Sequence, residues 1–122
     1  MKVPAGHQTV MPYLILNDAK GFMEFTKEVF NAKVTHEDYH DSGILRHGEI
    51  QIGNSTIMFG NVLPEWGSAP AGLFVYVENA DETYNLALKH GAIKIMEPAD
   101  HPYGRSCGVK DANENTWWIT SL

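Results

Sequence analysis

The sequence predicts an α+β fold made of two copies of one βαβββ module. The first observation is the order of elements, because the patterns of a strand, an amphipathic helix and three strands occur twice along the 122 residues. The second is a weak match between the halves, in which Leu14–Ala19 aligns with Val75–Ala80. We therefore expect a single domain, 1–122, that divides into a first module at about 10–60, a connecting loop at 61–71 and a second module at about 72–122.

The first module is expected to begin with a strand at Val10–Leu16, followed by a helix that Asn17-Asp18 initiates. Apolar residues at spacings of three and four place this helix at Ala19–Phe30, and Asn31 suits the left-handed position that ends a helix. Three strands should follow, the last two joined by a Gly53-Asn54 turn: Lys33–Tyr39, Ile44–Ile52 and Thr56–Gly60.

The loop at 61–71 contains two prolines, a glycine and Trp66, so it is either a linker or a binding loop. The second module should open with a strand at Leu73–Val77 and a helix that Asn79 caps and Gly91 ends. Three further strands are expected after this helix: Ala92–Met96, Arg105–Lys110 and Thr116–Ser121.

Composition excludes several function classes. The net charge is −6 and no stripe of Lys or Arg is present, which disfavours nucleic acid and anionic membranes as partners. No window approaches the roughly 20 apolar residues that a membrane span needs. Cys107 is the only cysteine and has no intrachain partner, which is typical of a reducing compartment, so a cytoplasmic protein is expected.

Several short stretches resemble one known superfamily. These are the helix ends FNA and HGA, the stretch HPYGR and the closing segment GVKDANENTWW. Together with the doubled module they resemble the vicinal oxygen chelate superfamily, which includes glyoxalase I, bleomycin-resistance proteins and extradiol dioxygenases. The closing segment is similar to the family signature DP-x-G-x-x-W, with Ala112 for the proline and Glu114 for the glycine. HPYGR is similar to the WGDR stretch of a small glyoxalase-like branch.

The resemblance implies that each module curls into a partial barrel, that two modules enclose a cavity and that the protein is a homodimer. Enzymes of the superfamily bind a divalent metal in the cavity through His, Glu or Gln. The four corresponding positions here are Met11, Met58, Gly72 and Trp118. None of these supplies the oxygen or imidazole donors that such metals require, so we expect no metal and no other cofactor.

Strand alternation predicts which side chains face the cavity instead. With Leu14, Leu16, Trp117 and Ile119 packed under the helices, the opposite faces present an apolar and aromatic set. This set is Met11, Tyr13, Ile15, Thr56, Met58, Phe74, Tyr76, Thr116, Trp118 and Thr120. Such a lining is typical of a small-molecule pocket, although Trp118 and Tyr76 would also suit the core of a filled barrel.

Five more residues complete the set of candidate ligand-binding residues. His47 and Glu49 lie two apart on one strand and so point to the same face, where they would contact a ligand, transfer protons or simply be solvated. Trp66 would cover a cavity mouth or pack on its own domain. Arg105 would orient an anionic ligand or form an ion pair with Asp111, and Tyr103 precedes it in the HPYGR stretch. The full set is Tyr13, His47, Glu49, Met58, Trp66, Phe74, Tyr76, Tyr103, Arg105 and Trp118.

Three hypotheses follow. The first is a metal-free, dimeric binding protein for a small aromatic or apolar molecule, such as an antibiotic that it sequesters. The second is a metal-dependent glyoxalase-like lyase or dioxygenase with relocated ligands such as His47 and Glu49. The third is a structural or regulatory partner that binds no small molecule. The residues favour the first, and identify no catalytic group.

Overall fold

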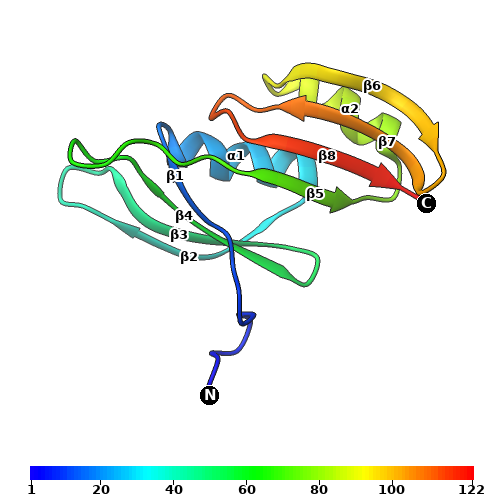
Figure 1. Cartoon of the computed structure of the whole chain (residues 1–122). Helices are drawn as coiled ribbons and strands as arrows, with labels where there is room; N and C mark the ends of the chain where they lie inside the picture. The colour runs from blue at the N-terminus through cyan, green and yellow to red at the C-terminus, as the bar shows by residue number, and fades with distance from the viewer.

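The computed structural model describes residues 1–122 and contains the two βαβββ modules in tandem (Figure 1). The elements of the first module are β1 (Tyr13–Leu16), α1 (Ala19–Phe30), β2 (Lys33–Tyr39), β3 (Leu45–Ile52) and β4 (Ser55–Asn61). Those of the second are β5 (Gly72–Tyr76), α2 (Ala80–Lys89), β6 (Ile93–His101), β7 (Gly104–Lys110) and β8 (Thr116–Ser121). Each module forms its own four-stranded sheet, in the orders β1-β4-β3-β2 and β5-β8-β7-β6. The predicted fold class is thus confirmed.

Both helices begin and end where capping residues predict. The side chain of Asp18 accepts a hydrogen bond from the backbone N–H of Gly21, and that of Asn79 accepts one from Glu82. Asn31 ends α1 in the left-handed conformation, with φ 56°, and Gly91 follows α2 with φ 98°. These signals are local, so they can be identified without knowledge of tertiary contacts. Neither helix is long and apolar enough to cross a membrane.

Two expected strand boundaries were wrong by three residues or more, and several others differ by one residue. β1 begins at Tyr13 rather than Val10, because the preceding residues leave the sheet. β6 continues to His101 instead of ending at Met96, and it includes Pro98. This strand is the edge of its sheet, and its register shifts between Met96 and Ala99, where Pro98 lies. A proline is tolerated there because an edge strand has one side without ladder hydrogen bonds.

One face of each sheet packs against the helices. The side chains expected there, including Leu14, Leu16 and Ile119, are buried. Trp117 of β8 packs on Phe30 of α1 with ring centroids 4.4 Å apart, and Phe22 lies 4.9 Å from Phe59. The aromatic core therefore continues from the first module into the second, and α1 contacts α2.

The turn between β7 and β8 also joins the modules. The side-chain oxygen of Asn113 accepts a hydrogen bond from the backbone N–H of Asp18 at 2.8 Å, and its amide donates to the Asp18 carbonyl at 2.9 Å. Asn115 accepts a hydrogen bond from the backbone of Ala71 at 2.9 Å. The turn thus holds the start of α1 and the end of the connecting loop, 95 and 44 residues away in sequence.

Replacing Glu114 by glycine is expected to raise the free energy of unfolding by up to about 1 kcal/mol. Glu114 has φ 68°, a conformation that costs a residue with a side chain about 1–2 kcal/mol and costs glycine nothing. Part of this gain is offset by the greater freedom of glycine in the unfolded chain. Urea denaturation measures the difference. A variant less stable than the wild type would contradict the prediction.

Candidate functional site

The face of each sheet that is opposite the helices is largely open. On the second sheet three aromatic side chains lie together there: Phe74 is 51% exposed, Tyr76 67% and Trp118 36%. Phe74 and Tyr76 are two apart on β5 with ring centroids 5.3 Å apart, and Phe74 is the register partner of Trp118 on β8. We call these three residues the aromatic platform.

Gly108 of β7 makes room for the indole of Trp118. A Cβ atom at Gly108 would lie 2.6 Å from the Trp118 ring, closer than carbon atoms approach. The indole therefore lies across the backbone of β7 rather than standing away from the sheet. The aromatic platform consequently presents a broad apolar surface, as a flat ligand requires.

A cavity of about 400 Å³ borders the aromatic platform where β5 meets the hairpin of β3 and β4. Phe74 and Tyr76 line it from one side, and Pro12, Thr56 and Ile57 from the other. The cavity is thus made by both modules. Its size is within the range of small-molecule sites.

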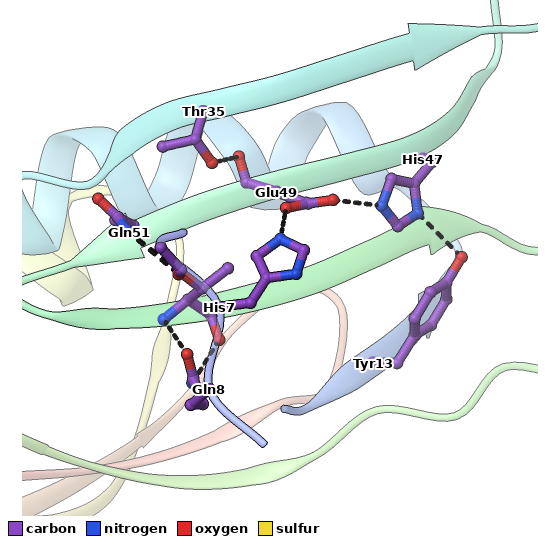
Figure 2. A network of polar contacts seen from close by, with 9 residues as sticks. His7, Gln8, Tyr13, Thr35, His47, Glu49 and Gln51 are labelled. Atoms are coloured by element: carbon purple, nitrogen blue, oxygen red, sulfur yellow. Dashed lines mark hydrogen bonds and ion pairs between the residues drawn. The ribbon is translucent and has the colours of Figure 1, made fainter. Parts of the chain in front are cut away.

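The open face of the first sheet carries a polar cluster that consists of His7, Tyr13, His47 and Glu49 (Figure 2). The two carboxylate oxygens of Glu49 contact different imidazoles: Oε1 lies 2.6 Å from His7 Nε2, and Oε2 lies 2.8 Å from His47 Nε2. The other nitrogen of His47, Nδ1, lies 3.1 Å from the Tyr13 hydroxyl. The structure thus brings the predicted residues Tyr13, His47 and Glu49 into one hydrogen-bonded chain.

His7 is the member of this cluster that sequence reasoning missed. It reaches Glu49 because the segment around it lies along β4: the side chain of Gln8 bonds both the N–H and the C=O of Thr56. The hydroxyl of Thr56 donates to the carbonyl of Gly6. Residues 4–8 have no periodic pattern, so no local signal places them on the sheet.

The side chain of Glu49 is only 13% exposed. Burial acts to raise its pKa, but the hydrogen bonds from His47 and His7 outweigh burial, and the pKa is lowered. Glu49 is therefore ionised near neutral pH. A carboxylate only accepts hydrogen bonds, so both histidines donate to it through Nε2.

The lowered pKa of Glu49 predicts a pH-dependent contribution to stability. A carboxyl group with a lowered pKa in the folded state stabilises the fold above its unfolded value of 4.5, and this contribution is lost as pH falls through the folded value. We expect Glu49→Gln to lower the free energy of unfolding by about 1–2 kcal/mol at pH 7 and by less below about pH 4. Denaturation at pH 7, 5 and 3 measures this difference. An equal loss at all three would contradict the prediction.

The positions that bind metal in the superfamily do not fit a metal here. Met58 and Trp118 lie on the open faces, Gly72 has no side chain and Met11 precedes β1. Glu49 is the register partner of Met58 on the neighbouring strand, so a carboxylate is close to one of these positions. However, His7 and His47 each contact a different oxygen of Glu49. No three His, Cys, Asp or Glu side chains form a group that would hold a metal ion.

The other predicted ligand-binding residues lie apart from both clusters. Trp66 is exposed in the connecting loop and lines none of the cavities. Tyr103, at the turn between β6 and β7, stacks on His101 with centroids 5.2 Å apart. Arg105 forms ion pairs with Asp81 at 2.6 Å and with Asp100 at 3.1 Å, which raise its pKa. The expected pair of Arg105 with Asp111 was wrong, because Arg105 instead ties β7 to the start of α2.

Two threonines that were expected to line the cavity are buried. Thr56 lies beneath the segment that contains Gly6, and Thr120 is within 2.8 Å of the hydroxyl of Ser106. Cys107 is also buried, and this burial raises the pKa of its thiol to about 11. The side chains of Thr120 and Cys107 are therefore closed to a ligand, whereas Thr56, although buried, borders the cavity.

Comparisons with known proteins extend these observations. Residues 7–119 match the family model of the Glyoxalase/Bleomycin resistance protein/Dioxygenase superfamily. The uncharacterized protein Mb0911c of Mycobacterium bovis is 24% identical over 109 residues, which are 80% of this chain and 72% of the relative. TioX from Micromonospora sp. ML1 has a similar structure, with a TM-score of 0.73 at 20% identity over 94% of this chain and 96% of TioX. Fosfomycin resistance protein FosX from Mesorhizobium loti has a TM-score of 0.66 at 16% identity, and the match covers 93% of this chain and 90% of FosX. At these identities the two structures show a shared fold.

Proposed function

The chain belongs to the Glyoxalase/Bleomycin resistance protein/Dioxygenase superfamily, and from this premise we propose that it binds a small, flat organic molecule without a metal ion. The aromatic platform carries the proposal. Three neighbouring aromatic side chains with so much exposed surface are unusual on a face with no ligand, because apolar patches on a protein surface commonly mark binding sites. Sequestration of an aromatic or apolar compound is the simplest use of such a surface.

The chemistry of the donors supports the metal-free part of this proposal. Thioethers and an indole take the places at which the enzymes of the superfamily bind their metal. Hard and borderline divalent ions bind poorly to such groups. An apolar ring of the ligand, rather than a pair of oxygens, is then the feature that these positions recognise.

We propose in addition that two copies of the chain form the complete site. The aromatic platform and the polar cluster both lie on open sheet faces, and the exposure of Tyr76 and Phe74 leaves one side of the ligand in water. A second copy placed over these faces would cover the ligand and remove the exposed rings from water. Light scattering at micromolar concentration is expected to give about twice the mass of 13.6 kDa. A monomer at all concentrations would contradict this part of the proposal.

A thermal-shift screen tests the binding function. The panel contains aromatic antibiotics, quinones, flavonoids and apolar metabolites, together with fosfomycin because of the resemblance to FosX. A ligand that binds only the folded protein at 100 times its dissociation constant stabilises it by about 2.7 kcal/mol, which is a measurable rise in melting temperature. If no flat aromatic compound raises the melting temperature, the proposed function fails.

Metal analysis of protein purified without chelator tests the absence of a metal. We expect substoichiometric nickel, manganese, iron and zinc, and no rise in melting temperature when these ions are added. One tightly bound ion per chain would contradict the proposal and favour a metal-dependent lyase or dioxygenase instead. Glu49→Gln, examined in the same way, would show whether that ion is held near the polar cluster.

A further inference from the structure

The chain of hydrogen bonds from Glu49 through His47 ends on a hydroxyl that is open to solvent. Tyr13 lies on β1 and His47 on β3, with β4 between them. The two side chains meet across β4, with ring centroids 5.5 Å apart and the Tyr13 hydroxyl within hydrogen-bond distance of His47 (Figure 2).

The proton positions in this chain follow from the ionised carboxylate. Because Glu49 accepts only, the Nε2 atom of His47 carries a hydrogen. A neutral imidazole has one N–H, so the Nδ1 atom of neutral His47 carries a lone pair. Nδ1 faces the Tyr13 hydroxyl at 3.1 Å, and the hydroxyl must then be the donor. A carboxylate, an imidazole and a hydroxyl in this order have the arrangement that activates hydroxyl groups in enzymes.

We propose that Tyr13, His47 and Glu49 form a proton relay, and that the Tyr13 hydroxyl exchanges a proton with a bound molecule. In the step, the hydroxyl proton of Tyr13 moves to His47 Nδ1 while the phenolic oxygen takes a proton from the ligand. The ligand becomes an anion and His47 becomes an imidazolium that Glu49 stabilises. His47 then releases the proton on Nδ1 to water and becomes neutral again. No covalent bond to the protein forms, and no metal or redox partner takes part.

The chemistry of the relay limits the class of ligand. A phenol exchanges protons readily only with groups of similar acidity, such as phenols, enols and 1,3-dicarbonyl compounds. In each of these the anion is delocalised over a planar system. The relay therefore suits the same flat molecules as the aromatic platform. The proton exchange with a ligand rests on the proposed binding function, whereas the hydrogen-bonded chain of Tyr13, His47 and Glu49 does not.

The protonation state of His47 decides whether the relay can operate, and several charged or titratable groups surround this residue. Glu49 and Tyr13 contact His47 directly, His7 shares the carboxylate, and the ring of His36 on β2 lies 5.6 Å from that of His47. Asp38, the register partner of His47, is held in an ion pair by Arg46. Protonated His47 carries a hydrogen on Nδ1 and no longer accepts the Tyr13 proton. The relay thus requires the neutral form of His47.

Labelling with an aromatic sulfonyl fluoride tests the proposal without any ligand. The reagent modifies tyrosine hydroxyls that readily lose their proton, and peptide mass spectrometry gives the rate at each position. Tyr103 is a matched internal control, because it is 52% exposed, as against 50% for Tyr13, and its hydroxyl has no hydrogen-bond partner in the protein. We expect Tyr13 to react about tenfold faster than Tyr103 at pH 8.

Variants test whether the faster labelling of Tyr13 depends on the relay. His47→Gln is expected to abolish it and Glu49→Gln to reduce it several-fold, whereas His36→Gln, which alters a histidine with no bond to Tyr13, should leave it unchanged. Equal rates at Tyr13 and Tyr103 in the wild type, or an excess that survives His47→Gln, would overturn the proposal. Nitrogen chemical shifts of His47 in the wild-type protein give an independent readout. Hydrogen on Nε2 and none on Nδ1 is expected at pH 8, and the opposite tautomer would overturn the relay even if a variant fails to fold.

Discussion

Replacing Asp111 by alanine is expected to lower the free energy of unfolding by about 3 kcal/mol or more. The carboxylate of Asp111 is buried and accepts hydrogen bonds from the backbone N–H groups of Asn113 and Asn115 at 2.9 and 3.0 Å. It also accepts one from the indole N–H of Trp117 at 2.8 Å. All three donors are buried, and each costs about 1–3 kcal/mol when it loses its partner.

Urea denaturation of Asp111→Ala measures this loss, and Asp41→Ala is the control. Asp41 is exposed in the turn after β2, so its removal changes the net charge equally but should alter stability by no more than about 0.5 kcal/mol. Asp111→Asn keeps one acceptor oxygen and should fall between the wild type and the alanine variant. A loss below about 1 kcal/mol in Asp111→Ala would show that the turn does not depend on this carboxylate.

Replacing Trp118 by alanine is expected to weaken the binding of a flat aromatic ligand about thirtyfold, which corresponds to about 2 kcal/mol. The substitution removes the largest ring of the aromatic platform and exposes the backbone at Gly108. Because the indole is partly exposed, at 36%, its loss should alter stability much less than affinity. Calorimetric titration with the most stabilising compound of the thermal-shift panel measures the change.

Two further variants locate the binding surface. Trp118→Phe retains a flat ring and should recover most of the affinity. Trp66→Ala tests the separate prediction that the tryptophan of the connecting loop covers the ligand, and an unchanged affinity would remove Trp66 from the site. If Trp118→Ala binds within twofold of the wild type, the aromatic platform is not the binding surface.

Much of the architecture follows from local sequence signals. The helix caps at Asp18 and Asn79, the left-handed residue Asn31 and the alternation in β8 specify elements without reference to distant residues. The repeated order of these elements then predicts two modules. The end of β6 could not be predicted in this way, because Pro98 is compatible with a strand only when that strand lies at the edge of a sheet.

The candidate site, too, could be predicted from the sequence only in part. Alternation along β5 and β8 is sufficient to place Phe74, Tyr76 and Trp118 on one face, because side chains two residues apart on a strand point the same way. The pairing of Arg105 was misjudged, because Asp81 lies on α2 and approaches β7 only when the helix packs on its sheet.

The sequence by itself therefore determined the modules, their helices and the aromatic platform on the open face of the second sheet, since each depends on periodicity or capping within a few residues. Only the tertiary structure decided the hydrogen-bonded chain of His7, Glu49, His47 and Tyr13. These side chains come from three separate segments, and their contacts depend on strand order and on the position of residues 6–8 along β4. Such distances between segments are not encoded in any local pattern.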